Sequence, residues 1–98
     1  MYAEQKLTHI VALHMSQYGG NYQEWYVGVS ADPKGSLFND HGVIEAEDPW
    51  ISRKCVSNVA ARTIERYFVK KGCKGGQADE DKSALYLYAY MIRPHTCQ

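Results

Sequence analysis

The sequence lacks most of the features that identify a secreted protein, a membrane-spanning protein or a protein stabilised by a structural metal ion. It has three cysteines among 98 residues, an odd number without a CxxC pair, so neither a disulfide framework nor a zinc ribbon is indicated. No apolar run approaches the length of a membrane span, and no charged-then-apolar leader opens the chain. A reducing, cytoplasmic setting without membrane association is therefore the expectation.

The chain also lacks net charge, because eleven Lys and Arg residues balance eleven Asp and Glu residues. Charge is nevertheless segregated along the sequence. Residues 51–74 carry seven basic residues and one acid, Glu65, whereas acids gather in residues 40–48 and 79–81. Such segregation suits a surface that binds a polyanion, and it equally suits acidic and basic segments that neutralise each other across the fold.

No internal repeat is present, and 98 residues with an apolar fraction of 45% are enough for one domain spanning residues 1–98. Hydrophobic periodicity and turn residues divide this domain into six elements. The predicted strands cover residues 7–15, 25–30, 50–56 and 84–92, and the predicted helices cover residues 33–41 and 57–71. The order β-β-α-β-α-β, with the first two strands as a hairpin, predicts an α+β domain with a small, largely antiparallel central sheet and flanking helices.

The segment SNVAARTIERYFVKK, residues 57–71, has the clearest helical pattern. Ser57 suits an N-cap and Gly72 suits a left-handed C-cap. Glu65 lies at the margin of the apolar side of this helix, among basic residues. It is either a salt-bridged surface acid, or a metal ligand or electrostatic element that faces a nucleic-acid groove. The residues predicted to face the core at helical spacing are Val59, Ala60, Ile64, Tyr67 and Phe68.

Tyrosines and histidines mark two of the predicted strands. Tyr86, Tyr88 and Tyr90 share one face of the last strand. A tyrosine ladder of this kind usually packs under a helix and less often stacks on nucleic-acid bases. His9 and His14 lie in the first apolar run, where a histidine is more often a hydrogen-bonded core residue than a catalytic one.

Two segments, read together, resemble the GIY-YIG nuclease superfamily. The first is Tyr26-Val27-Gly28 and the short helix that ends at Asp40-His41, which is similar to the family's strand ending in a Tyr-x-Gly step before a helix that finishes near a histidine. The second is the helix from Ala61 to Lys71, which is similar to the family's pattern of Ala, Glu four residues on, an apolar pair and two lysines. The resemblance covers residues 26–71 and extends the fold prediction to a GIY-YIG-like domain.

This resemblance implies a magnesium-dependent endonuclease that engages nucleic acid, DNA in preference to RNA. Tyr26 would position or activate the attacking water, and Glu65 would bind the one Mg²⁺ ion. A carboxylate-held magnesium can neutralise charge at the phosphate and stabilise the leaving oxygen. The nucleic-acid-binding residues would come from the basic segment: Arg53, Lys54, Arg62, Arg66 and Lys70.

The chain departs from the family pattern at two places. The first signature, Gly-Ile-Tyr, is absent, and the first predicted strand offers His9 and its neighbours instead. The arginine expected in the short helix is Ser36, and Lys34 could replace it only as a point charge. Cleavage is therefore expected to be weak or lost. The alternative is a non-catalytic protein-interaction module, such as a regulator or inhibitor from a mobile element, with Trp25, the tyrosines and the acidic residues 79–81 as its contact surface.

Overall fold

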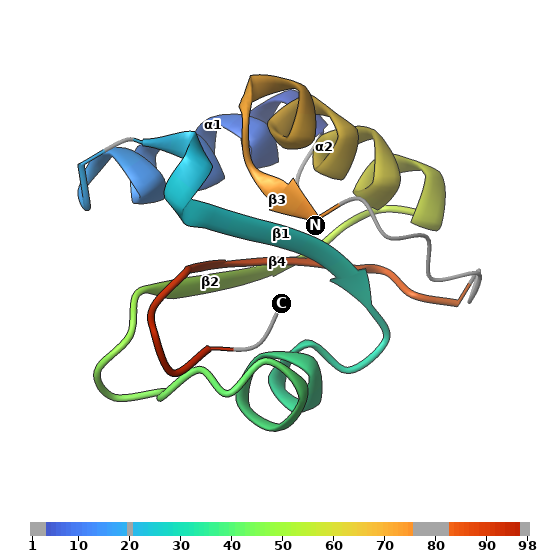
Figure 1. Ribbon diagram of the computed structural model, residues 1–98. Helices are drawn as coiled ribbons and strands as arrows, with labels where there is room; N and C mark the ends of the chain where they lie inside the picture. The colour runs from blue at the N-terminus through green and yellow to red at the C-terminus, as the bar shows by residue number, and fades with distance from the viewer. Residues whose placement is uncertain (1–3, 20, 76–82, 97–98) are drawn as a thin grey trace.

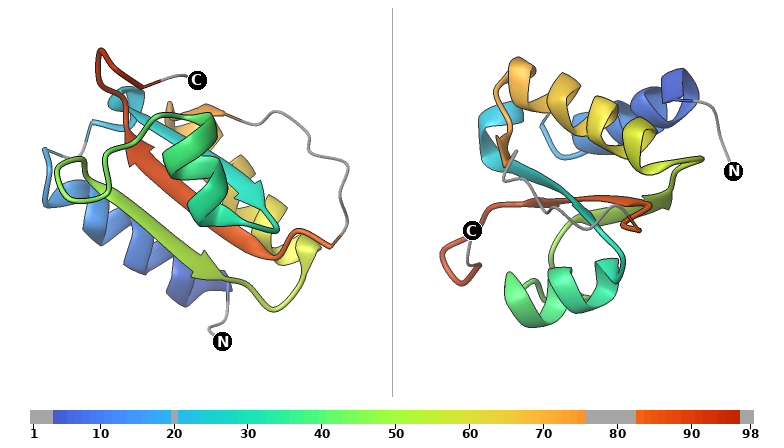
Figure 2. Two further views of the ribbon diagram at one scale, coloured as in Figure 1. Left: turned by 90° about the horizontal axis from the view of Figure 1, so that it is seen from below. Right: turned by 90° about the vertical axis from the view of Figure 1, so that its right-hand side faces the viewer.

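In the computed structural model of the protein, residues 4–19, 21–75 and 83–96 are described, and they form three layers (Figure 1). A four-stranded sheet lies in the middle, α1 and α2 cover one of its faces, and the short helix η2 lies under the other (Figure 1, Figure 2). The elements are α1 (Glu4–Ser16), η1 (Tyr22–Glu24), β1 (Trp25–Ser30), η2 (Gly35–Asp40), β2 (Trp50–Lys54), α2 (Asn58–Lys71), β3 (Lys74–Gly75) and β4 (Tyr86–Met91). The predicted acidic loop at residues 79–81 and Cys97 lie outside the described residues.

The sheet has the strand order β2-β4-β1-β3 and is mixed. The central strand β4 pairs antiparallel with both β1 and β2, whereas the two-residue strand β3 pairs parallel with β1. The predicted α+β class is confirmed, and the three longer strands form the antiparallel part. Strand β3 was not predicted, because two residues in a glycine-rich stretch carry no strand pattern.

The predicted strand over residues 7–15 is wrong, since this run lies inside α1. Leu7, Val11 and Met15 recur at every fourth residue and are buried, whereas Leu13 between them is 50% exposed. A buried residue at every fourth position is the periodicity of a helix. The apolar residues between the buried ones hide this periodicity in the sequence. The predicted hairpin with β1 therefore does not form, and in place of β-β-α-β-α-β the described chain begins with a helix.

Helix α2 confirms the prediction for residues 57–71. The Ser57 hydroxyl accepts a hydrogen bond from the Ala60 amide at 3.0 Å, and Gly72 ends the helix with a φ of 121°. Two residues assigned to the core side are misplaced, because Val59 is 73% and Tyr67 is 42% exposed. The residues that α2 does bury are Ala60, Ala61, Ile64, Glu65 and Phe68.

The predicted short helix at residues 33–41 is also confirmed, as the π-helix η2. The Asp32 carboxylate accepts a hydrogen bond from the Gly35 amide at 3.1 Å, and Gly42 follows the helix with a φ of 71°. The His41 amide donates to the Ser36 carbonyl at 3.0 Å, which closes the wider turn of a π-helix. That closure holds the His41 side chain at the end of η2, against the sheet.

The core between the helices and the sheet contains side chains that the sequence left unassigned. Trp25 is fully buried there, so the prediction that it forms an exposed contact surface is wrong. Cys55 and Cys73 are buried, and burial raises the pKa of the Cys73 thiol to about 12, so it stays protonated near neutral pH. No helix in the described part of the chain is long and apolar enough to span a membrane.

Candidate functional site

A cluster of aromatic side chains and one histidine occupies the sheet face that η2 covers. Because alternate residues of a strand point to the same face, the pairing places Tyr26 of β1 beside Tyr90 of β4, and Gly28 beside Tyr88. His41 reaches this face from the end of η2. Its Nε2 lies 3.0 Å from the Tyr88 hydroxyl, and its Nδ1 lies 2.9 Å from the Tyr90 hydroxyl.

The Tyr26 ring completes this cluster. Its centroid lies 4.7 Å from that of His41 and 5.3 Å from that of Tyr90, with the two tyrosine rings stacked at 22°. Tyr26 is 7% exposed. Within the part of the chain that the structure describes, its hydroxyl makes no hydrogen bond, unlike the hydroxyls of Tyr88 and Tyr90. The Tyr26 hydroxyl is therefore the phenol in this cluster that can receive a ligand or a water molecule.

The bond between Tyr88 and His41 joins a ring nitrogen to a phenol that stays protonated. Burial, followed by the nearby charges of Tyr26, Tyr90, Glu65 and Asp40, strongly raises the pKa of Tyr88, so this phenol keeps its proton. A protonated hydroxyl can donate or accept, so the tautomer of His41 sets the direction of each bond. The two bonds together hold His41 in a defined orientation between the two tyrosines.

Gly28 has a specific role in this arrangement. A Cβ atom placed on Gly28 would lie 2.4 Å from the Cζ and hydroxyl oxygen of Tyr88, so the Tyr88 ring lies directly over the glycine. In the Tyr-x-Gly step, Tyr26 therefore supplies a buried phenol, and Gly28 leaves room for the Tyr88 ring of the neighbouring strand.

Replacing Gly28 with alanine is expected to displace the Tyr88 ring and break its bond to His41. The strain should lower the free energy of unfolding by about 1–3 kcal/mol, as measured by urea denaturation. The ring signals of His41 in an NMR spectrum should shift as well. In a Tyr88→Ala background the same substitution should cost much less, and an equal cost in both backgrounds would show that the ring is not the obstacle.

Glu65 is the most unusual charged residue of the chain. It lies on the inward side of α2, next to Ile64 and one turn before Phe68, which are also buried, and it is 4% exposed. Burial raises the pKa of its carboxyl, and the charges of Arg62 and Arg66 only partly oppose that effect. The carboxylate has no hydrogen-bond or ion-pair partner among the described residues, and its oxygens are not among the fully buried atoms that lack a partner, so they reach solvent. An acid with a raised pKa at the edge of the core is a candidate functional residue.

Electrostatics connect Glu65 to the tyrosine cluster. Its charge raises the pKa of Tyr26, after burial, and also contributes to the raised pKa of Tyr88. Tyr26 and Glu65, which the sequence predicts as partners in one site, therefore lie within electrostatic range of each other. They belong to different elements, β1 and α2, and meet only through the fold.

The other predicted catalytic residues are not brought to this cluster. His9 is exposed on α1, which covers the opposite face of the sheet (Figure 1). Lys34 is exposed just before η2. Ser36, at the position of the expected arginine, shares a hydrogen bond of 2.7 Å with the Ser30 hydroxyl at the end of β1. No described lysine or arginine replaces that arginine within η2.

The five predicted nucleic-acid contacts do not form one groove. Arg53 and Lys54 are consecutive in β2 and point to opposite faces of the sheet, and the Arg53 charge acts on His14 of α1. Arg62 and Arg66 are the cations whose charges act on Glu65. Lys70 is exposed in the last turn of α2, one to two turns further along.

Three residues of the cluster were not predicted as site residues: His41, Tyr88 and Tyr90. The alternation of tyrosines along residues 86–90 was visible, but its position opposite Tyr26 depends on the β1–β4 register. A register is not recoverable from the sequence when more than fifty residues separate the strands. His41 could have been found from the histidine that closes the short helix of the GIY-YIG-like pattern.

The residues present are compatible with a weakly held magnesium ion. No group of three or more His, Cys, Asp or Glu side chains comes together within residues 4–19, 21–75 and 83–96. Magnesium often keeps several waters and binds through one or two carboxylates, which Glu65 can supply alone. Comparison with known proteins adds no family: no family model matches the chain, and no curated protein or solved structure matches it.

Proposed function

We propose that this domain binds nucleic acid and hydrolyses its phosphodiester bonds slowly, at the site formed by Tyr26, Glu65 and the His41 cluster. The observation that carries the proposal is Glu65: a largely buried residue whose carboxylate has no hydrogen-bond or ion-pair partner among the described residues and whose charge acts on two tyrosines of the opposite sheet face. Acids with perturbed pKa values that act electrostatically on unbonded hydroxyls are candidates for catalytic sites.

Each residue of this site has a role that its surroundings support. Glu65 would hold Mg²⁺, which supplies positive charge at the phosphate when bound. Arg62 and Arg66 add positive charge beside it for the nucleic-acid backbone. The Tyr26 hydroxyl would orient the attacking water. His41 keeps the surrounding tyrosines in place through its two hydrogen bonds.

The GIY-YIG-like character of the domain is part of this proposal. The family's first signature, Gly-Ile-Tyr, is absent from the sequence. Tyr88 of β4 would take the place of its tyrosine, because the Tyr88 ring lies over Gly28, two residues after Tyr26. The element order differs from the predicted one, so the likeness would be one of site composition and not of chain order. Because Ser36 stands in place of the expected arginine, a preorganised donor is missing and slow cleavage is expected.

A magnesium-dependent cleavage assay on supercoiled plasmid and branched DNA tests this function. The native protein should cleave slowly, and Ser36→Arg should increase the rate, since the side chain at position 36 begins beside the end of β1. Lys34→Arg, an exposed position just before η2, is the matched control and should change the rate little. No DNA binding at low salt and no gain from Ser36→Arg would contradict the proposal.

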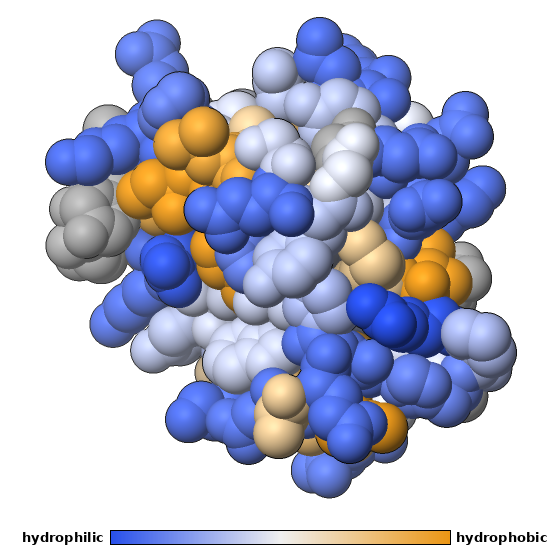
Figure 3. Space-filling view, turned by 90° about the vertical axis from the view of Figure 1, so that its left-hand side faces the viewer, coloured by the Kyte–Doolittle hydropathy of each residue, from blue (hydrophilic) through white to orange (hydrophobic). Residues whose placement is uncertain are grey.

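The second candidate function is protein interaction, and one observation favours it. Several large apolar side chains are exposed, and one flank of the molecule carries a distinct apolar patch among hydrophilic side chains (Figure 3). The most exposed of them are Val59, Val56 and Leu13, at 73%, 54% and 50%. This candidate does not explain the unpaired Glu65, so the nucleic-acid proposal is preferred.

A further inference from the structure

Helices α1 and α2 lie side by side on the face of the sheet opposite η2 (Figure 1, Figure 2). A hollow with a volume of about 270 Å³ lies between them. It is lined by Gln5 and Thr8 of α1 and by Thr63, Ile64 and Tyr67 of α2. None of these five side chains is charged, and we call the hollow the helix groove.

The helix groove suits an apolar side chain of a partner. Ile64 is buried in the core and forms the floor, whereas Tyr67 is exposed and stands at the rim. The Thr63 hydroxyl donates a hydrogen bond to the Val59 carbonyl of its own helix at 2.8 Å, so it needs no partner from a ligand. Since a cavity of roughly 150 Å³ already admits a benzene-sized group, the helix groove has room for at least one large apolar side chain.

The exposed side of α2 next to the helix groove is positively charged. Lys70 and Lys71 are exposed one turn after Tyr67, and the Lys71 Nζ lies 5.4 Å from the centroid of the Tyr67 ring. Arg66 is exposed as well. Within α2 the one acid is Glu65, which faces inward. A partner that inserts an apolar side chain into the groove therefore meets cations at the rim, and acids at that place strengthen its binding.

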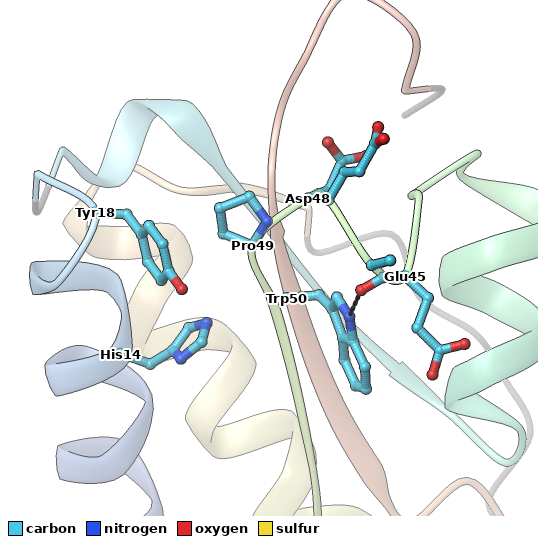
Figure 4. Close-up of a pocket in the computed structure, with 8 residues that line it drawn as sticks. His14, Tyr18, Glu45, Asp48, Pro49 and Trp50 are labelled. Atoms are coloured by element: carbon cyan, nitrogen blue, oxygen red, sulfur yellow. Dashed lines mark hydrogen bonds between the residues drawn. The ribbon is translucent and has the colours of Figure 1, made fainter.

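Another hollow of the molecule has the opposite charge. It lies between the end of α1, with His14 and Tyr18, and the segment that leads into β2 (Figure 4). Three of its eight lining residues are acids: Glu45, Glu47 and Asp48. These carboxylates repel a ligand that carries acids. Of the two hollows, the helix groove is therefore the one whose surroundings favour an acidic partner.

We propose that the helix groove binds an acidic, amphipathic helix of a protein partner. Such a helix presents apolar side chains four residues apart along one side, and it binds by laying that side into a groove. Acids on its flank then face Lys70 and Lys71. Nucleic acid is less suited to this place, because its phosphates need cations where the groove offers uncharged side chains. The proposal involves neither Tyr26 nor the Glu65 carboxylate, so it does not rest on the proposed nuclease function.

NMR titration of the full chain with a panel of acidic amphipathic peptides tests this proposal. Each peptide has about 16 residues, long enough to form a helix, with glutamates beside a pair of leucine, isoleucine or phenylalanine residues spaced four apart. At least one peptide should shift the amide signals of Thr63 and Tyr67 with a saturable curve. The same peptides with lysine in place of glutamate should bind about tenfold more weakly, because like charges then meet at the rim.

Two pairs of variants test the contacts. Tyr67→Ala should weaken peptide binding about fivefold or more, since truncating an aromatic anchor is costly. Tyr18→Ala is the matched control, because Tyr18 is 45% and Tyr67 is 42% exposed and Tyr18 lies outside the helix groove. Lys71→Glu should weaken binding about threefold, whereas Lys34→Glu, an exposed position just before η2, should leave it unchanged.

Several outcomes would overturn the proposal. They are the absence of a saturable shift with every peptide, equal affinity for the glutamate and lysine peptides, and equal effects of the two tyrosine variants. A single-stranded DNA that shifts the same groove signals in the absence of peptide would assign the groove to nucleic acid instead. Groove signals that move with protein concentration alone would assign it to a second copy of the chain.

Discussion

Replacing Glu65 with glutamine is expected to reduce magnesium-dependent DNA cleavage by about 10²–10³-fold, the usual effect of losing one preorganised electrostatic group. The loss is best measured in the Ser36→Arg background, where the starting rate should be higher. Glu45→Gln, which removes an exposed acid from the connection before β2, is the control and should leave the rate unchanged. Robust cleavage by Glu65→Gln would show that the active site lies elsewhere.

The same substitution should make the protein more stable near neutral pH. The pKa of Glu65 is raised in the folded state above its ordinary value of 4.5. The contribution of Glu65 to the free energy of unfolding is therefore fully present below pH 4.5 and is lost as the pH rises through the pKa of the folded state. Glutamine carries no charge at any pH. The difference in unfolding free energy between Glu65→Gln and the native protein should therefore grow from near zero below pH 4.5 to a gain at pH 7. A loss of stability at pH 7 would mean that Glu65 has a structural partner.

Replacing Ile64 with alanine should have the largest effect on stability, lowering the free energy of unfolding by about 2–5 kcal/mol. Ile64 is 1% exposed and packs in the core between α2 and the sheet. Val59→Ala on the same helix is the matched control, because Val59 is 73% exposed and its truncation should cost less than about 0.5 kcal/mol. Urea denaturation of both variants measures the difference, and similar costs at the two positions would contradict the orientation of α2.

The parts of the fold that could be predicted are those with local signals. Ser57 and Gly72 bracket α2, and Asp32 and Gly42 bracket η2, because capping residues act on amides and carbonyls within a few positions. Strands β2 and β4 follow from alternation. Helix α1 was mistaken for a strand because apolar residues between its buried positions, such as Leu13, hide the helical period.

The candidate site could be predicted only in part, because its residues are joined by tertiary pairing. Tyr26 and Glu65 were predicted through a resemblance, and each lies on an element with local signals. The contact of His41 with Tyr88 and Tyr90 depends on β4 lying between β1 and β2, an arrangement that no local pattern contains. The burial of Glu65 depends likewise on the rotation of α2 against the sheet. Glu65 lies at the margin of the apolar side of α2, so the sequence alone does not tell whether its carboxylate faces the sheet or the solvent.

The central proposal, that Glu65 holds a cation within electrostatic range of Tyr26, is tested most directly by titration with Mn²⁺ as a paramagnetic substitute for Mg²⁺. Paramagnetic broadening falls steeply with distance, so the amide signals that disappear first locate the ion. The account predicts saturable broadening centred on Glu65 and reaching Tyr26 and Gly28, abolished by Glu65→Gln and competed by Mg²⁺. Broadening centred on the acidic residues 45–48, or persisting unchanged in Glu65→Gln, would contradict it.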